Sequence, residues 1–173
     1  MIYRLLEASN PILSMRMPET TADEIKEKHG LTIQELFDNL KGTMAATGGI
    51  GLSANQCGLG IRAFVMYTNF EEKKATLFLN PKITWESEET STFTEGCLTY
   101  PFLFLNLSRP KKLTYTYTDI NGEPQESQFS GLSARVFQHE YDHMEGKNFT
   151  MLASKLKMDM ATKKAAKKIK KLK

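Results

Sequence analysis

Helical periodicity occurs in two separated parts of the chain. From residue 33 to residue 44, apolar side chains recur every three or four positions, which predicts an amphipathic helix packed on the core. Thr32 followed by Glu35 is the capping-box pattern that marks the start of such a helix. A second helix is expected around residues 133–145, with Ser133 as its N-cap and Gly146 just beyond its end. The first thirty residues follow no clear period, and we expect a loosely structured lead-in there.

Between these helices the hydrophobic period changes to two, the period of half-buried strands. Residues 62–67 and 76–80 predict a hairpin, because residues 69–74, most of which are charged, separate two apolar runs. A further exposed strand is expected over residues 83–93. Residues 111–120 alternate cleanly, and Asn121-Gly122 is a strong hairpin-turn signal before a return strand at 125–129. We therefore predict an α+β fold in which antiparallel sheets pack around the second helix.

Length and charge divide the chain into two unequal parts. A chain of 173 residues with 40% hydrophobic and 25% charged residues is typical of one globular domain, which we place at residues 1–150. Residues 151–173 form a tail with nine lysines and one aspartate, whereas the remainder has 14 basic and 19 acidic residues. The alanines of the tail favour a helix. Either the tail is a solvated end, or it docks electrostatically on RNA.

The sequence argues against membrane, exported and dinucleotide-binding proteins. No apolar run is long enough to cross a membrane, and the first seven residues contain no export-signal core. We therefore expect a cytoplasmic protein whose Cys57 and Cys97 are free thiols or metal ligands. Residues 49–54 superficially match a dinucleotide fingerprint, which requires a strand before it and a helix after it. Here a helix precedes the glycines, so we expect no nucleotide cofactor.

The centre of the second predicted helix reads His139-Glu140-Tyr141-Asp142-His143. Residues four apart lie on one face of a helix, so His139 and His143 can bind the same metal ion. Glu140 can then act as a general base on water held by that ion. The alternative is an ordinary amphipathic helix with two histidines on its polar face, because matches of five residues also occur by chance.

A catalytic metal needs a third protein ligand. Metzincins continue this motif to a third histidine, but the corresponding position here is Phe149, and His29 lies in a polar N-terminal segment. Gluzincins take a downstream glutamate, but the only acidic residue after Glu145 is Asp159 in the lysine-rich tail, so the ligand is expected upstream. Cys97 is the candidate, because one thiolate with two imidazoles is an accepted zinc-type ligand set. A buried structural cysteine is the alternative.

Three separated stretches together resemble the motifs of the peptide deformylases. That family carries G-x-G-L-A-A-x-Q, E-G-C-L-S and Q-H-E-x-D-H in this order, and the chain has close matches at residues 49–56, 95–99 and 138–143. The resemblance covers roughly residues 1–150. Ser53 replaces the usual Ala and Thr99 replaces the usual Ser. We expect neither replacement to change a group that does chemistry, and we expect any effect of them to be on the shape of the pocket.

The resemblance implies a reaction and a set of site residues. The reaction is hydrolysis of the N-formyl group from the initiator methionine of nascent polypeptides, which releases formate. One divalent ion is implied, Fe²⁺ in this family, although the ligand set also suits Zn²⁺, Ni²⁺ or Co²⁺. The implied roles are metal ligand for Cys97, His139 and His143, general base for Glu140, oxyanion donor for the Gln56 amide and the Leu98 backbone N–H, and peptide binding for Gly49, Ile50, Gly51 and Gly96.

Further residues are expected to support this site. We predict that Glu95 pairs with Arg109 and holds the cysteine loop, and that Asp142 orients a ligand histidine or caps the helix surface. The apolar residues 102–108 are expected to form a loop. Some bacterial deformylases use a C-terminal extension to sit near the ribosomal exit tunnel, which implies a similar role for residues 151–173.

Two other functions compete with this interpretation. A metalloprotease would share the helix motif, but the Cys97 ligand and the missing third histidine argue against it. A zinc-stabilised RNA- or ribosome-binding module would need a closed site with four ligands, and the sequence offers no evident fourth ligand.

Overall fold

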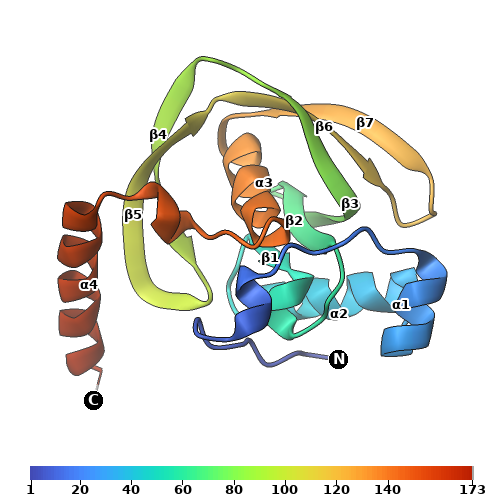
Figure 1. Ribbon diagram of the computed structural model, residues 1–173, viewed down its shortest axis with the longest axis horizontal. Helices are drawn as coiled ribbons and strands as arrows, with labels where there is room; N and C mark the ends of the chain where they lie inside the picture. The colour runs from blue at the N-terminus through green and yellow to red at the C-terminus, as the bar shows by residue number, and fades with distance from the viewer. Residues whose placement is uncertain (173) are drawn as a thin grey trace.

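The computed structural model describes residues 1–172, whose elements are arranged around one central helix (Figure 1). The helices are α1 (Ala22–His29), α2 (Ile33–Ala46), α3 (Gly131–Met144) and α4 (Lys155–Lys170), with short 3₁₀ turns at Pro11–Ser14, Ala54–Cys57 and Phe149–Leu152. The strands are β1 (Gly51–Ser53), β2 (Ala63–Asn69), β3 (Lys74–Glu86), β4 (Thr90–Cys97), β5 (Tyr100–Pro110), β6 (Lys112–Thr118) and β7 (Pro124–Ser130).

The strands form two antiparallel sheets on either side of α3. One sheet has the order β1-β2-β3-β6-β7, and the other is the β4–β5 hairpin. The apolar side of α3 packs on the larger sheet through the fully buried Phe137, whose ring contacts Phe64, Phe78 and Tyr115. On the other side of the helix, Arg135 donates hydrogen bonds to backbone carbonyls of β4 and β5. The helix is therefore held between the two sheets.

The predicted start of α2 is confirmed. Thr32 and Glu35 exchange hydrogen bonds between side chain and backbone, with a distance of 2.8 Å from the Thr32 nitrogen to the Glu35 carboxylate. The expectation of a loosely structured lead-in is wrong, because α1 begins at a second capping box made by Thr21 and Glu24. The buried Ile25 attaches α1 to the core. Helix α1 spans only eight residues and buries one side chain, so its sequence shows no clear helical repeat of apolar residues.

Three other boundaries differ from the predictions. The strand expected over residues 83–93 is the end of β3 and the start of β4, separated by a bend at 87–89. The N-cap of α3 is Ser130 rather than Ser133. Residues 102–108 are not a loop but part of β5, in which Leu103, Leu105 and Leu107 are buried.

The C-terminal tail packs against the outer side of the β4–β5 hairpin (Figure 1). Helix α4 places Met158, Ala161 and Ala165 toward β5, where a small cluster forms around Phe149. At the distal end of the helix, the Lys168 ammonium lies 5.9 Å from the centroid of the Phe104 ring. No helix among residues 1–172 is long and apolar enough to cross a membrane.

Candidate metal centre and active site

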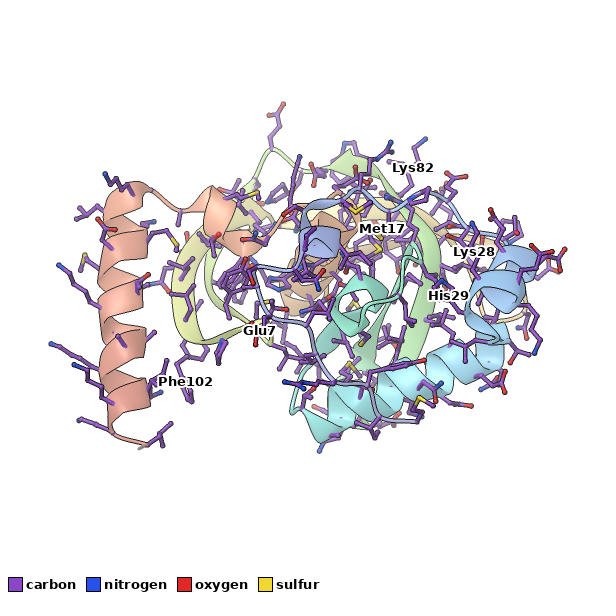
Figure 2. All side chains as sticks on the ribbon, turned by 60° about the horizontal axis from the view of Figure 1, so that its bottom comes forward. Glu7, Met17, Lys28, His29, Lys82 and Phe102 are labelled. Atoms are coloured by element: carbon purple, nitrogen blue, oxygen red, sulfur yellow. The ribbon has the colours of Figure 1, made fainter. Side chains whose placement is uncertain are left out.

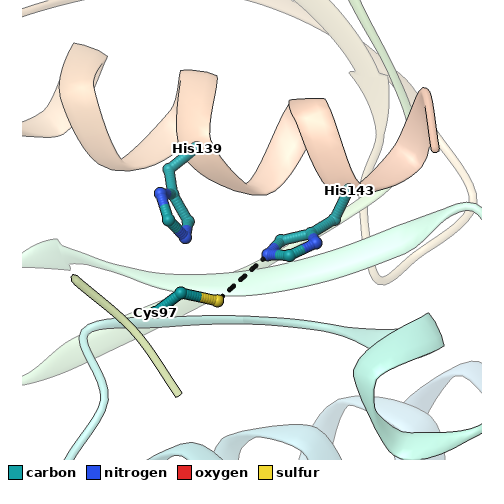
Figure 3. A group of neighbouring side chains, drawn as sticks. All are labelled: Cys97, His139 and His143. Atoms are coloured by element: carbon teal, nitrogen blue, oxygen red, sulfur yellow. Dashed lines mark hydrogen bonds between the residues drawn. The ribbon is translucent and has the colours of Figure 1, made fainter. Parts of the chain in front are cut away.

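The two histidines of α3 meet Cys97 at the end of β4 (Figure 3). One ligand atom from each of the three residues lies within 4.8 Å of the others, and Cys97 Sγ is 3.5 Å from His143 Nε2. We call these three residues the ligand cluster. A thiolate and two imidazoles at this separation suit a divalent transition metal with a further coordination position open.

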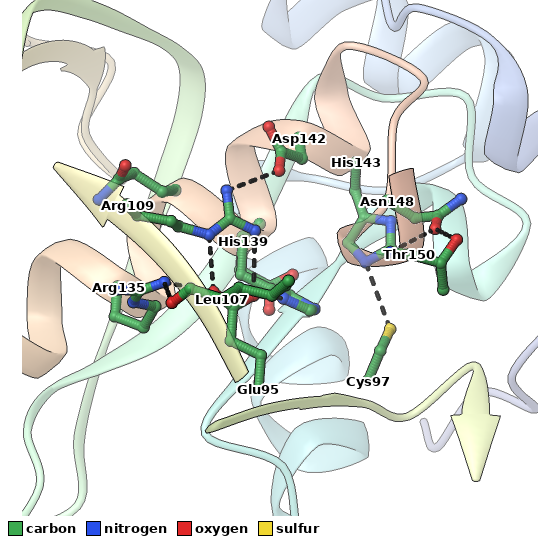
Figure 4. Close-up of polar contacts among 12 residues, drawn as sticks. Glu95, Cys97, Leu107, Arg109, Arg135, His139, Asp142, His143, Asn148 and Thr150 are labelled. Atoms are coloured by element: carbon green, nitrogen blue, oxygen red, sulfur yellow. Dashed lines mark hydrogen bonds and ion pairs between the residues drawn. The ribbon is translucent and has the colours of Figure 1, made fainter. Parts of the chain in front are cut away.

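Glu95 orients His139, one member of the ligand cluster, through the ring nitrogen that does not face Cys97 (Figure 4). Its carboxylate lies 2.9 Å from His139 Nδ1, which leaves the Nε2 atom of that ring for a metal. Arg109 donates two hydrogen bonds to Glu95, at 2.7 and 3.0 Å, and Arg135 donates one at 2.8 Å. We call these four residues the Glu95 network. Burial opposes ionisation of Glu95, but the bonds from His139 and the guanidinium of Arg109 hold its pKa well below its usual value.

The Glu95 network includes the predicted pair of Glu95 with Arg109. Asp142 lies at the edge of this network. Asp142 bonds to Arg109 at 2.7 Å and not to a histidine, so it is linked to His139 only through Arg109 and Glu95, and its two predicted roles stay predictions. Sequence reasoning missed the contact of Glu95 with His139 and the whole contribution of Arg135. One signal was present, because Glu95 is only two residues from Cys97, the predicted metal ligand.

Glu140 lies beside the ligand cluster and is almost completely buried. Its Oε2 atom accepts a 2.6 Å hydrogen bond from the Ser53 hydroxyl. A Cβ atom at Gly51 would lie 2.5 Å from Oε1 of Glu140, so this carboxylate needs a glycine in β1. Burial raises the pKa of Glu140. Ser53, which stands where the family motif has Ala, therefore contacts Glu140 directly, and the sequence did not reveal this contact.

The Gln56 side chain is fixed at both ends of its amide. Its oxygen accepts a hydrogen bond from the Ser53 backbone N–H at 3.0 Å. Its nitrogen donates to the Thr99 hydroxyl at 3.0 Å and lies 3.4 Å from Cys97 Sγ. The amide N–H groups therefore point toward the ligand cluster. Thr99 contributes through its hydroxyl, the group that it shares with the usual Ser.

A cavity of about 550 Å³ opens onto these residues. The residues proposed for peptide binding, Gly49, Ile50, Gly51 and Gly96, all line it together with Leu98. Its mouth is apolar, since Ile50, Phe102, Phe104 and Leu132 are large hydrophobic residues that remain partly exposed.

The other cysteine and the other histidine lie outside the ligand cluster. Burial, with a smaller contribution from the negative charge of Glu140, raises the pKa of Cys57 to about 12, so its thiol stays protonated and is a poor ligand. His29 lies on α1, at the opposite end of the molecule from Phe102 and α4 (Figure 2). Among residues 1–172, the potential ligand group contains only Cys97, His139 and His143.

Comparison with known proteins decides the family. The sequence model of the polypeptide deformylases matches residues 2–159. The chain belongs to the polypeptide deformylase family. It is 38% identical to the peptide deformylase of Pseudothermotoga lettingae over 84% of this chain and 80% of that relative. The deformylase crystal structure from Legionella pneumophila superposes with a TM-score of 0.85 at 32% identity, covering 99% of this chain and 97% of the other.

A deformylase encoded by a phage is also similar. The probable peptide deformylase of Synechococcus phage S-SSM7 gives a TM-score of 0.79 at 37% identity and covers 87% of this chain and 99% of the phage protein. Deformylases are hydrolases that remove the N-formyl group from nascent polypeptides, and this chain is an enzyme of that class. The predicted family and the predicted α+β fold are both confirmed. The family match argues against the metalloprotease and the binding module.

Proposed function

We propose that this deformylase hydrolyses N-formylmethionyl peptides in the cytoplasm, where nascent chains emerge, and that residues 1–150 carry the reaction. One observation supports this most strongly. Cys97 and His139 of the ligand cluster, the Glu140 carboxylate and the Gln56 amide all line the buried inner end of a single cavity, and the buried His143 lies 3.5 Å from Cys97. A formyl group is small enough to reach that inner end, and we expect larger acyl groups to be excluded by their size.

The ligand cluster would hold one divalent ion, for which we propose Fe²⁺, although Zn²⁺, Ni²⁺ and Co²⁺ also suit the donor atoms. When bound, such an ion would polarise the formyl oxygen and lower the pKa of water to about 7. The Nδ1 atom of His139 is already bonded to Glu95, so the orientation of this ligand is set before a metal arrives.

Glu140 moves the proton in the proposed mechanism. Its carboxylate takes a proton from the attacking water and later delivers it to the nitrogen of the departing amine. The Gln56 amide and the Leu98 backbone N–H donate hydrogen bonds to the oxygen that becomes negative, and a donor of this kind contributes about 2.7–4 kcal/mol. The glycines and Ile50 that line the cavity would pair with the backbone of the peptide.

Formate release tests the proposed reaction directly. We expect formyl-Met-Ala-Ser to yield formate when the protein is prepared without oxygen and loaded with Fe²⁺ or Ni²⁺, and acetyl-Met-Ala-Ser to yield no acetate. A chelator should abolish the release and added metal should restore it, because the reaction needs the ion that Cys97, His139 and His143 would hold. A fully metallated protein that releases no formate would contradict the proposal.

We propose a second role for residues 151–173, electrostatic docking on ribosomal RNA. Helix α4 turns Met158, Ala161 and Ala165 toward β5, so the opposite face points to solvent. By helical spacing this face carries Lys163, Lys167 and Lys170, all of which are exposed. A row of ammonium groups on one face of a helix can contact successive phosphates.

Charge removal on α4 should weaken binding to ribosomes. We expect the triple substitution of Lys163, Lys167 and Lys170 by glutamine to lower ribosome co-sedimentation at low salt. The slope of log K against log salt should fall by about 0.7–0.9 per lost phosphate contact. Formate release from the tripeptide should be unchanged, because these lysines do not line the cavity.

The control for this experiment removes three exposed lysines elsewhere, Lys26, Lys74 and Lys82. Equal loss of co-sedimentation in both triple variants would show that net charge matters rather than α4, and would contradict the docking role. Substitution is preferable to truncation, because deletion of α4 would uncover the buried Leu103, Leu105 and Phe149.

A further inference from the structure

Ser53 and Glu140 are joined by a hydrogen bond inside the protein. The Ser53 residue has no exposed surface and Glu140 is 4% exposed, and the bond between Ser53 Oγ and Glu140 Oε2 is 2.6 Å long. This length is typical of a hydroxyl that donates to an ionised carboxylate, which is a strong class of hydrogen bond. The two residues are 87 positions apart, so the bond links β1 to α3.

The two oxygen atoms of the Glu140 carboxylate have different surroundings. Ser53 holds Oε2, whereas Oε1 lies against Gly51, where a Cβ atom would be only 2.5 Å away. Gly51 lines the cavity, but Ser53 does not. The bond therefore keeps one oxygen on the protein side and leaves the other at the cavity wall.

We propose that Ser53 is a positioning residue for the general base, whose hydroxyl fixes the Glu140 carboxylate so that Oε1 faces the substrate. This inference rests on the proposed role of Glu140 in deformylation. A carboxylate without this bond can rotate about its terminal torsion, which has a broad and roughly two-fold distribution. The fixed oxygen is then already in place when the water gives up its proton.

The same residue supports Gln56 by a separate atom. The Ser53 backbone N–H donates to the Gln56 side-chain oxygen at 3.0 Å. The Ser53→Ala substitution removes the hydroxyl but keeps this backbone bond, so it separates the effect on Glu140 from any effect on the oxyanion donor. Alanine is the usual residue at this position in the family motif, and the variant is therefore expected to fold.

The first measurement is steady-state formate release by Ser53→Ala. We expect kcat to fall about ten-fold, because small misplacements of a reacting group cost up to about 10²-fold. KM should stay within about two-fold of the parent, since Ser53 does not line the cavity. Bound metal, counted per protein chain, should be unchanged. An unaltered kcat in Ser53→Ala would overturn the proposal. A ten-fold rise in KM at unchanged kcat would overturn it as well.

Thr43→Val is the matched control. Thr43 also has no exposed surface and its hydroxyl also bonds within the protein, to the Asn39 carbonyl, but it lies in α2 and not at the cavity. This variant should lose stability while its kcat stays at the parental value. A similar fall in kcat for Thr43→Val would show that any lost buried hydroxyl slows the enzyme, and would overturn the specific role of Ser53.

A second measurement does not depend on activity. In metal-free protein, Ser53→Ala should lower the urea midpoint of unfolding, whereas the same substitution in a Glu140→Ala background should not, because its partner is already gone. Equal shifts in the two backgrounds would overturn the proposal. If the parent releases no formate, the proposed function fails, and this comparison still decides whether Ser53 and Glu140 act as a pair.

Discussion

The Glu140→Gln substitution is expected to lower kcat for formate release by about 10²–10⁴-fold, the usual contribution of general acid–base catalysis. Glutamine has nearly the same size as glutamate but cannot take a proton from water at neutral pH. Its amide oxygen can still accept the hydrogen bond from Ser53, so the side chain should keep its place. The ligand cluster is unchanged in this variant and should hold metal as before.

Three measurements check this expectation, namely kcat, the metal bound per chain and the urea midpoint. Glu123→Gln serves as the control, because Glu123 is an exposed residue next to the β6–β7 turn and does not line the cavity. It should retain parental activity. A Glu140→Gln protein that binds a full equivalent of metal and keeps more than a tenth of the parental kcat would contradict the role of Glu140 as base.

The parts of the site that could be predicted depend on spacing within one element. Two histidines four apart share a helix face in any fold, so His139 and His143 were predictable as a pair. Cys97 became a candidate by elimination of the other possible ligands. The α2 helix was predictable for the same reason, because its cap and its apolar stripe are both local patterns.

The parts that could not be predicted depend on contacts between elements. Ser53 reaches Glu140 only because β1 packs beside α3, and no pattern within either stretch shows this. The strand over residues 102–108 was concealed because both of its faces are apolar at its start. One face covers Phe149 and α4, and the other carries Phe102 and Phe104 at the cavity. Polar residues alternate with leucines only from residue 105 to residue 108, which is too short a stretch to reveal the strand.

Loss of Glu95 is expected to damage both stability and metal binding. Glu95 is buried and is the shared partner of Arg109, Arg135 and His139. The Glu95→Ala substitution would leave two buried guanidinium groups short of a partner, and breaking a buried ion pair in this way costs about 3–5 kcal/mol. It would also free the ring of His139, and loss of such an orienting partner lowers metal affinity by about 10–100-fold.

Urea unfolding of the metal-free protein measures the loss of stability alone. Competition with a chelating dye measures the loss of metal affinity. Asp142→Asn is the matched control, because Asp142 lies at the more exposed edge of the same group of charges and contacts only Arg109 among them. Its effects on unfolding and on metal affinity should both be smaller. If Glu95→Ala unfolds at a lower urea concentration but binds metal as tightly as the parent, the network stabilises the fold without orienting His139. Unchanged stability would contradict the account of the buried charges itself, because Arg109 and Arg135 would then have to find equally good partners among neighbouring backbone carbonyls.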